Sequence, residues 1–395
     1  MSERAELQKI AVFAPSFPPA FLGGGPARTL FALVRSAPEY SIVKVIAPNR
    51  DADGSQLPVA ADVWTQLDGV DLYYGSTHQL KNLIKTYREA RRAKPDVVYL
   101  NSLFNLRFSI IPLMLSRLNY WNGATILLAP RGELDLGALR IRRTKKRLFL
   151  YVFKLLHLPS KIIWHASAAM EAATIRETWG ENTTVIVREN ETDLPPMAQQ
   201  PEVYDNGISA AFLGRIAPKK GLLLALQALR GTDANVELTI YGPEEDLEYV
   251  RKCKEAVKRL PSNVSVRFKG AVAPDEVRST LAVHDFLLMP TSGENFGHVI
   301  AESLSVACPV ICSNLTPWSE LLHEGGGLVV DVATPEAWLH AIEEFVKASP
   351  AARLAQRRKA ADAYEKWRQA PKGAHVFSHF PLQRPPHTAR ALRAK

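Results

Sequence analysis

The segment HDFLLMPTSGENFGHVIAESLSVACPVICS, residues 284–313, decides the fold. Its first apolar run predicts a buried strand that ends at Pro290. A loop with two glycines follows, then apolar residues at helical spacing over 296–306, and then a second apolar run at 309–313. A strand, a helix and a second strand joined in this way indicate a βαβ unit, in which the two strands run parallel.

The same alternation of strands and helices continues on both sides of this segment. It predicts one domain over residues 208–348 and another over residues 9–190, joined by a linker at 191–207 that is rich in proline and polar residues. The expected fold class is α/β, with two Rossmann-like, doubly wound parallel-sheet domains facing a cleft. Residues 349–395 are expected to form a C-terminal helix and a poorly ordered basic tail.

Composition places the chain among soluble globular proteins. It has 395 residues, of which 47% are hydrophobic and 23% charged, and its three cysteines show no disulfide or zinc spacing. No apolar run reaches the length of a membrane span, and the N-terminal residues lack the apolar region of a secretory signal. We therefore expect a cytoplasmic protein.

The net charge of +9 is unevenly distributed. Residues 131–161 carry nine Lys and Arg against two acidic residues, and residues 351–395 are also basic. Two local patches favour a polyanionic partner or an anionic membrane over nucleic acid, although solvated basic faces would give the same pattern.

The loop and helix at 290–303 carry two glutamates, Glu294 and Glu302, with seven residues between them. Backbone N–H groups at the start of a helix suit a phosphate, and carboxylates can bind vicinal hydroxyls. Together they suggest a nucleotide sugar as ligand. Spacing alone would equally fit two glutamates on a solvated helix face.

A second loop strengthens the first interpretation. In AFLGRIAPKKG, residues 211–221, Arg215 and Lys220 follow a predicted strand and precede a helix. Two cations at this position can neutralise a diphosphate leaving group.

These two loops resemble those of the retaining glycosyltransferases of family 4, which have the GT-B fold. The resemblance rests on G-R-x4-K-G at 214–221, on the two glutamates, and on LTIYGPEED, FKGAVAPDEV and PVICSNLTPW, and it extends over residues 9 to about 348. It implies that Arg215 and Lys220 bind the donor diphosphate, that Glu302 holds the ribose, and that Glu294 contacts the transferred sugar and stabilises charge at its anomeric carbon. The other donor contacts that it implies are Val272 near the base and the backbone amides of Asn295, Phe296, Gly297 and His298. Family members need no metal and no cofactor besides the nucleotide-sugar donor, which here is a substrate.

The N-terminal domain offers further candidate residues. The glycine loop GGGPARTL, residues 23–30, follows the first strand; the resemblance places Gly24 and Gly25 over the donor phosphates, and Arg28 beside the donor or the acceptor. This loop does not match G-x-G-x-x-G, so a dehydrogenase is disfavoured. Arg131, in LLAPRGELD, stands where many relatives have a histidine, and could contact the donor sugar or an acceptor phosphate. His165 follows as a candidate sugar contact, with a structural role as the better expectation.

The function that this resemblance implies is transfer of a sugar, with retention of configuration, from a nucleotide-diphosphate sugar to a glycan or lipid-linked acceptor in bacterial surface polysaccharide synthesis. Because no carboxylate nucleophile is evident, we favour same-face transfer assisted by the leaving phosphate over double displacement. A nucleotide-sugar epimerase, a phosphorylase, or an inactive paralogue that serves as an assembly subunit are the alternatives.

Residues 138–158 predict an interfacial helix. Their first half carries six cations, including Arg140 and Arg142, and their second half is bulky and apolar. Such a helix would hold the enzyme on the anionic inner face of the plasma membrane. Alternatively, the apolar half packs on the sheet of the N-terminal domain.

Overall fold

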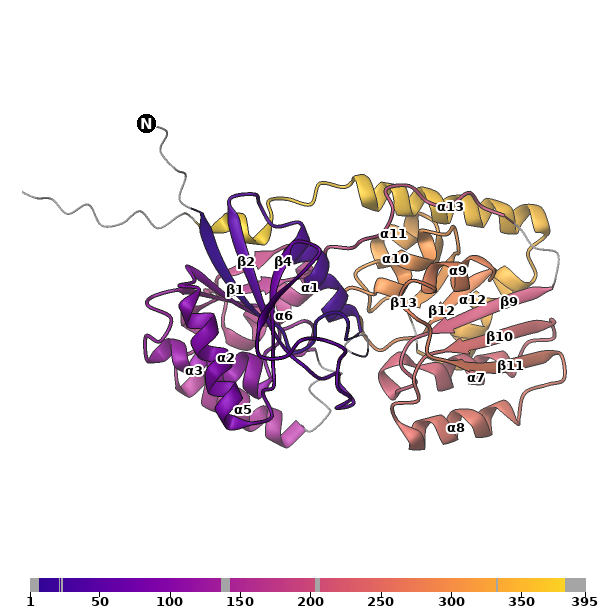
Figure 1. Cartoon of the computed structure of the whole chain (residues 1–395). Coiled ribbons are helices and arrows are strands. Elements are labelled where there is room, and N and C mark those ends of the chain that lie inside the picture. Colours follow the sequence, from indigo (N-terminus) through magenta and orange to yellow (C-terminus); the bar gives the residue numbers. More distant parts are fainter. Residues whose placement is uncertain are drawn as a thin grey trace, which may run out of the picture. The chain divides into compact units, whose positions relative to one another are not determined.

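The computed structural model describes residues 7–20, 22, 24–135, 143–202, 207–331 and 333–380. These residues form two compact units (Figure 1). The first takes the described residues of Met1–Glu133, Leu148–Thr192 and Gly373–Lys395, and the second those of Leu134–Arg147 and Asp193–Lys372.

The first unit is built on an eight-stranded sheet with the order β3-β4-β2-β1-β5-β6-β7-β8. All neighbouring strands are parallel except β3, which pairs antiparallel with β4. The strands are β1 (Gln8–Phe13), β2 (Ser41–Pro48), β3 (Trp64–Leu67), β4 (Val70–Gly75), β5 (Val97–Leu100), β6 (Thr125–Leu128), β7 (Ile162–Ala166) and β8 (Val185–Val187). The α-helices are α1 (Gly25–Arg35), α2 (Leu80–Arg92), α3 (Ile111–Arg117) and α6 (Ala169–Trp179), together with the part of α5 (Arg143–Leu155) from Leu148 onward.

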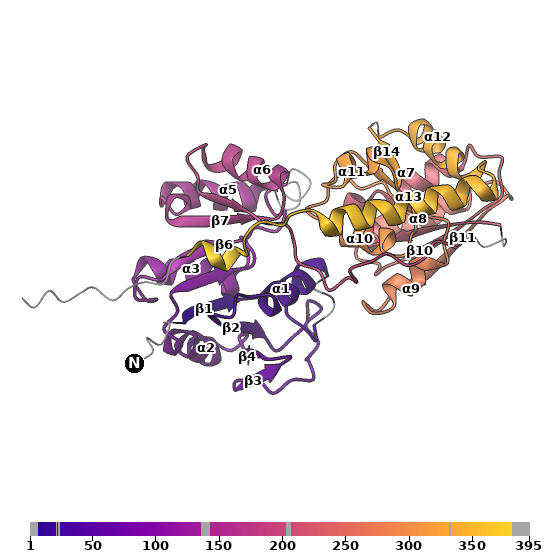
Figure 2. The same cartoon turned by 90° about the horizontal axis from the view of Figure 1, so that it is seen from above.

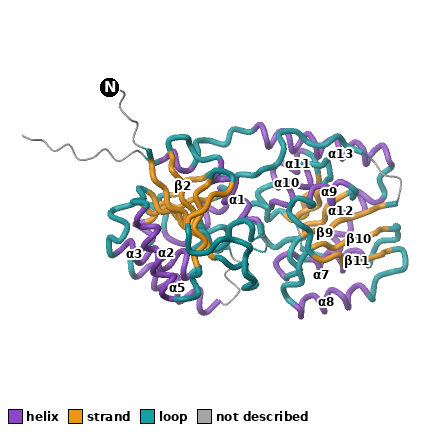
Figure 3. The backbone as a smooth tube through the Cα atoms, in the orientation of Figure 1, coloured by secondary structure: helices purple, strands orange, loops and turns teal. Residues whose placement is uncertain are grey.

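The second unit is built on a six-stranded sheet, all parallel, with the order β11-β10-β9-β12-β13-β14. In Figure 3, strands flanked by helices form each sheet. The strands of the second unit are β9 (Ile208–Leu213), β10 (Val236–Tyr241), β11 (Val264–Gly270), β12 (Phe286–Met289), β13 (Val310–Ser313) and β14 (Gly327–Val330). The α-helices of this unit are α7 (Leu222–Leu229), α8 (Leu247–Val257), α9 (Val277–Ala282), α10 (His298–Leu304), α11 (Ser319–Glu324), α12 (Pro335–Val346) and α13 (Pro350–Gln369).

Helices cover both faces of the second sheet. The cluster on one face takes buried side chains from α7, α8 and α12, and the cluster on the other takes them from α9, α10, α11 and α13. Burial on both faces explains why the strands are continuous apolar runs: all four residues of β12 are buried. Two doubly wound parallel sheets are the GT-B fold that the sequence predicts.

The order of each sheet fixes where a ligand can bind. In the second unit, β9 connects outward to β10 on one side and β12 lies on its other side, so the chain reverses direction between β9 and β12. In the first unit, the same reversal lies between β1 and β5. Loops that leave the carboxyl ends of such strand pairs diverge, and ligands of open α/β sheets bind there.

The C-terminal segment differs from the prediction. Beyond α13, residues 376–379 form a short 3-10 helix (Figure 2). Its Val376 and Phe377 are fully buried in the core of the first unit. Gln8 of β1 donates a side-chain hydrogen bond to the Phe380 carbonyl at 2.8 Å, and the Phe377 ring packs edge-on against Tyr99 at 5.7 Å. The described part of the predicted poorly ordered tail is therefore a component of the first core. Residues 381–395 lie outside the described residues.

Candidate functional site

Three loops meet at the carboxyl edge of the second sheet. Gly242, after β10, lies so near the loop after β9 that an added Cβ would come 1.9 Å from the Gly214 carbonyl oxygen. Gly221, at the start of α7, lies equally near the end of β12: its Cβ would come 1.8 Å from the Pro290 carbonyl oxygen. Both have positive φ angles, so only glycine suits these positions. The glycines thus let the loops after β9, β10 and β12 pack directly on one another.

This packing brings Lys220 to Glu294. The Lys220 ammonium lies 2.6 Å from Glu294 Oε1, and the two side chains are 17% and 11% exposed. Thr291, the first residue after Pro290, donates its hydroxyl to the same carboxylate oxygen at 2.9 Å. The loops are also joined through backbone, because Ser292 N donates to the Lys219 carbonyl oxygen at 2.8 Å. Lys220 and Glu294, which are 74 residues apart in the sequence, therefore form one mostly buried ion pair.

Arg215 lies in the same loop in a different state. It donates two hydrogen bonds to the Glu245 carboxylate, at 3.0 and 2.8 Å, and the two side chains are 58% and 49% exposed. An exposed guanidinium that is paired with an exposed carboxylate can exchange it for a phosphate at little cost in free energy. Lys220 is therefore held in place by its mostly buried partner, whereas a ligand in solvent can reach Arg215.

The two glutamates are not neighbours on a solvated helix face, which was the alternative interpretation of their spacing. Glu294 lies in the loop, whereas Glu302 is in the middle of α10 and only 3% exposed. The helix itself is shorter than predicted: it begins at His298, after Gly297 with φ 81°, and ends at Leu304. Phe296 is buried beside Trp318 and accepts the Trp318 indole N–H on its carbonyl oxygen.

The remaining predicted donor residues lie around this edge. Asn295, Gly297 and His298 follow Glu294 at the entrance of α10, where the His298 and Phe296 rings pack at 4.8 Å. Val272 follows β11 and is half-buried against the core that includes α10. The second unit alone thus collects its predicted donor-binding residues along one edge of its sheet.

In the first unit, Gly24 and Gly25 lie at the start of α1, after β1. Gly24 has φ 64°, and an added Cβ would meet no protein atom within 4 Å, so its backbone conformation rather than protein packing requires glycine. Arg28 lies in the first turn of α1 and is half-buried.

Arg131 and His165 belong to one hydrogen-bonded chain. Arg131 Nη2 donates to the Tyr99 hydroxyl at 2.6 Å, this hydroxyl lies 2.8 Å from His165 Nδ1, and His165 Nε2 lies 3.2 Å from the Arg188 carbonyl oxygen. Since a carbonyl only accepts, His165 carries its proton on Nε2 and receives one from Tyr99 on Nδ1. Burial, and then the Arg131 charge, holds the pKa of His165 well below its ordinary value, and burial raises the pKa of Tyr99 to about 12.

The surroundings of His165 favour the structural role over the sugar contact. The side chain is 1% exposed, neutral, and bonded at both ring nitrogens. The sequence analysis did not identify the side chains that hold Arg131, namely Tyr99, Asn101 and Asn190. The sequence offers a signal for Asn101, which directly follows the apolar run at 97–100, but not for Asn190, which two charged residues separate from its strand.

The predicted interfacial helix corresponds in part to α5. Phe153 is buried against Trp164 and Trp179, which agrees with packing on the domain. Five apolar side chains nevertheless remain exposed, by 39–67%: Leu148, Tyr151, Val152, Leu155 and Leu156. Arg140 and Arg142 lie outside the described residues, and no helix in the described part of the chain is long and apolar enough to span a bilayer.

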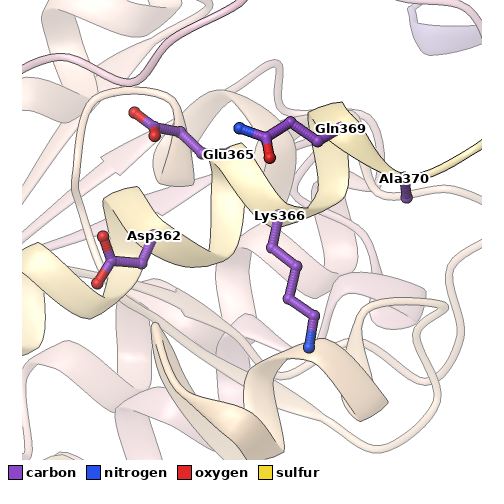
Figure 4. Close-up of a pocket in the computed structure, with 5 residues that line it drawn as sticks. All are labelled: Asp362, Glu365, Lys366, Gln369 and Ala370. Atoms are coloured by element: carbon purple, nitrogen blue, oxygen red, sulfur yellow. The ribbon is translucent and has the colours of Figure 1, made fainter.

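A separate hollow of about 490 Å³ lies along α13 (Figure 4), lined by Asp362, Glu365, Lys366, Gln369 and Ala370. Two of its side chains are bound elsewhere: Glu365 accepts from the Ala198 amide at 3.4 Å, and Lys366 pairs with Glu324. This hollow contains none of the predicted donor residues. Across the described ranges, no group of three or more His, Cys, Asp or Glu side chains is placed to hold a metal ion.

Comparison with known proteins assigns a class to the second unit. Residues 196–366 match the family described as Glycosyl transferases group 1. The chain is 29% identical over 143 residues to the D-inositol 3-phosphate glycosyltransferase of Corynebacterium urealyticum, a match that covers 34% of each chain. It is 27% identical over 139 residues to the lipopolysaccharide 1,2-N-acetylglucosaminetransferase of Salmonella typhimurium, covering 33% of this chain and 36% of that one. The chain thus spans about a third of the length of these curated relatives.

Solved structures resemble the whole fold. Sucrose-phosphate synthase from Thermosynechococcus elongatus superposes with a TM-score of 0.71 at 17% identity, and Anabaena HepE in complex with UDP and glucose with 0.65 at 16% identity. Each match covers 91% of this chain and 94% of the other. At such identities the likeness establishes the fold, and both sheets take part in it.

Proposed function

We propose that the chain is a retaining glycosyltransferase of family 4 that transfers a sugar from a nucleotide-diphosphate donor to a glycan or lipid-linked acceptor. One observation carries the proposal: the carboxyl edge of the second sheet, within the matched family region, joins Lys220 to Glu294 and places Arg215 on the same loop as Lys220. Cations beside a carboxylate suit a ligand that combines a diphosphate with a sugar.

The proposed roles follow from burial and charge. Arg215 exchanges Glu245 for the donor diphosphate, while Lys220 neutralises the phosphate nearer the sugar and keeps Glu294 in place. Glu294 then contacts the transferred sugar, and Glu302 the ribose hydroxyls. Val272 lies near the base, and the backbone from Asn295 to His298 holds sugar and phosphate oxygens. As the bond to the leaving phosphate breaks, its growing negative charge is stabilised by the two cations.

The proposed reaction needs no metal, since side-chain cations take the place of a divalent ion. The leaving phosphate oxygen accepts the acceptor proton on the face where the new bond forms, which retains the configuration. A crystal structure of HepE holds UDP-glucose, so UDP is the first nucleotide to try on this chain.

The test is release of nucleoside diphosphate from candidate sugar donors. Arg215→Ala is expected to lower turnover about 100-fold or more, as loss of one preorganised charge donor does elsewhere. Arg267→Ala is the matched control, because Arg267 is also 58% exposed and paired with a glutamate, Glu237, but lies within β11. Equal activity of both variants and the wild type would contradict the site assignment. Interconversion of the donor sugar without release of nucleoside diphosphate would favour the epimerase. If neither reaction occurs, the result would favour the inactive assembly subunit.

We further propose that the enzyme works in bacterial surface polysaccharide synthesis, in the cytoplasm and peripherally on the inner face of the plasma membrane. The support is α5, where exposed Leu148, Tyr151 and Leu155 lie on the same helix as exposed Lys145 and Arg147. Apolar side chains that enter the headgroup region and cations near anionic lipid reinforce each other, each cation contributing about 1 kcal/mol.

Sedimentation with vesicles tests this association. We expect binding to anionic vesicles but not to neutral ones, weakened by salt, by Lys145→Gln with Arg147→Gln, and by Leu148→Ser with Leu155→Ser. Leu247→Ser is the control, because Leu247 is a 73% exposed leucine on α8 in the other unit. Equal recovery in the supernatant with both vesicle types at low salt would instead indicate a soluble acceptor.

A further inference from the structure

The Arg131 guanidinium lies at the carboxyl edge of the first sheet, next to the point where the strand order reverses. It is held by the ends of three strands: Asn101 follows β5, Arg131 itself follows β6, and Asn190 follows β8. The Arg131 backbone has φ 54°, a conformation uncommon for a residue with a side chain. Such a conformation at a sheet edge where ligands bind is a reason to look for a ligand.

Among the described residues, the guanidinium donates to three side chains, all of them neutral. Nε donates to Asn101 Oδ1 at 2.8 Å, Nη1 to Asn190 Oδ1 at 2.6 Å, and Nη2 to the Tyr99 hydroxyl at 2.6 Å. Asn101, Asn190 and Tyr99 are themselves 5% exposed or less. Rigid, buried acceptors therefore fix the orientation of the guanidinium without neutralising its charge.

The nearby carboxylates are engaged with backbone N–H groups instead. Glu133 accepts from the amides of Leu103 and Phe104 at 2.6 and 3.0 Å. Glu171 accepts from the Gly132 amide at 2.6 Å and from the Ser167 amide at 2.8 Å. These two carboxylates thus stabilise the loops on either side of Arg131.

Other arginines of the chain show what is unusual here. Arg188 pairs with Glu191, and Arg353 pairs with Asp285 at 3.1 Å. Arg357 donates to carbonyl groups only, but it is 3% exposed and closed off from any ligand. Arg131 combines neutral partners with a half-buried position that solvent reaches.

The remaining donors define the ligand. A guanidinium has five N–H groups, two on each Nη, and the three bonds use one on each nitrogen. One N–H is left on Nη1 and one on Nη2, and within the described part of the chain neither has a protein acceptor. Two N–H donors on adjacent nitrogens of an uncompensated cation match two oxygens of a phosphate or carboxylate.

We propose that Arg131 binds an anionic group, a phosphate or a carboxylate, on the acceptor substrate, and so selects charged acceptors over neutral ones. The identification of the anion as part of an acceptor rests on the proposed transferase function, whereas the anion site itself rests on residues of the first unit alone. Tyr99, Asn101 and Asn190 are positioning residues for this site, and the neutral His165 anchors Tyr99 from behind.

Calorimetric titration of the full chain with inorganic phosphate, and separately with acetate, tests the site. Because the donor site also attracts phosphate, the comparison is made in Lys220→Ala protein with and without Arg131→Gln. We expect Arg131→Gln to weaken the remaining phosphate binding at least tenfold and Arg131→Lys to weaken it less. Stronger binding of acetate than of phosphate would identify the group as a carboxylate. Equal affinity with and without Arg131→Gln would overturn the proposal.

A second measurement needs no variant. Crystals of the wild-type chain soaked in selenate are expected to show an anomalous peak within hydrogen-bond distance of Arg131 Nη1 and Nη2, and absence of that peak would also overturn the proposal. The thermal shift induced by a set of nucleoside diphosphates, UDP among them, separates the two hypotheses. If no nucleoside diphosphate stabilises either wild type or Arg131→Gln, the transferase function fails while the anion result stands. If one of them stabilises both proteins and phosphate does not distinguish the two, only the anion site fails.

Discussion

The ion pair of Lys220 and Glu294 should contribute to stability, whereas that of Arg215 and Glu245 should not. Replacing Lys220 by Met leaves the Glu294 carboxylate, whose side chain is 11% exposed, with the Thr291 hydroxyl as its hydrogen-bond donor among the described side chains. Removing one partner of a fully buried pair costs about 3–5 kcal/mol, so this partly exposed pair should lose about 2–3 kcal/mol. Glu294→Gln should lose less, because the Lys220 ammonium has three hydrogens that water can reach.

A double-mutant cycle isolates the pairwise contribution. For Lys220→Met with Glu294→Gln we expect a coupling energy of about 1–3 kcal/mol. For Arg215→Met with Glu245→Gln, both side chains being about half exposed, we expect less than about 1 kcal/mol. Hydrogen exchange in peptides covering residues 286–304 is the suitable readout, because the two units need not unfold together.

Activity should follow a different pattern from stability. Both Lys220→Met and Arg215→Met should lower nucleoside diphosphate release by about 100-fold or more, since both cations act on the leaving phosphate. The exposed pair thus separates the two effects: Arg215→Met should be stable and inactive. A coupling energy for the exposed pair as large as that for the buried one would refute the reasoning from burial, and an active Arg215→Met would refute the assignment of the donor diphosphate.

Three further outcomes are expected. Phe377→Ala should lower the free energy of unfolding of the first unit by about 3–5 kcal/mol, because the ring is fully buried there, and hydrogen exchange in β1 and β5 should become faster. His379→Ala, at an exposed position, is the control and should lower it little. Equal effects of the two variants would contradict the packing of Phe377. Burial lowers the pKa of His284 to about 4, so the folded chain keeps this side chain neutral while the unfolded chain protonates it below about pH 6.5. Stability from this residue is then complete above pH 6.5 and falls by about 3 kcal/mol as the pH drops to 4, and a urea titration of His284→Gln at the same pH values should lack that loss. Excess EDTA should leave nucleoside diphosphate release unchanged; activity abolished by EDTA and restored by Mg²⁺ or Mn²⁺ would require a metal.

Much of the architecture could be predicted because parallel strands buried on both faces are continuous apolar runs. The strand at β12 and the loop and strand that follow it were located from such runs alone. The hairpin of β3 and β4 was missed because β3 has four residues, none of them buried, and because Asp71 interrupts the apolar residues of β4. The helix α10 was predicted too long, because the αL conformation of Gly297 delays its first turn.

The C-terminal segment was mispredicted for a different reason. Residues 371–380 have two prolines nearby and no periodicity, which is typical of an unstructured tail. Their order comes from contacts distant in the sequence: Arg188 donates to the Gly373 carbonyl oxygen at 2.6 Å, and the Leu33 carbonyl oxygen lies 3.1 Å from His375 Nε2. Local sequence carries no information about such partners.

The candidate site shows the limit of spacing as evidence. Counting residues along one helix placed Glu294 and Glu302 on a common face, but α10 begins only after the αL residue Gly297, so Glu294 lies outside the helix. Glu294 is instead positioned by Lys220, 74 residues away, through an approach that glycine at 221 permits. Gly221→Ala would therefore act on Glu294 from a distance: a Cβ 1.8 Å from the Pro290 carbonyl oxygen must push the two loops apart. The carboxylate and its cation would separate without either being changed, so this variant should lose activity as Lys220→Met does.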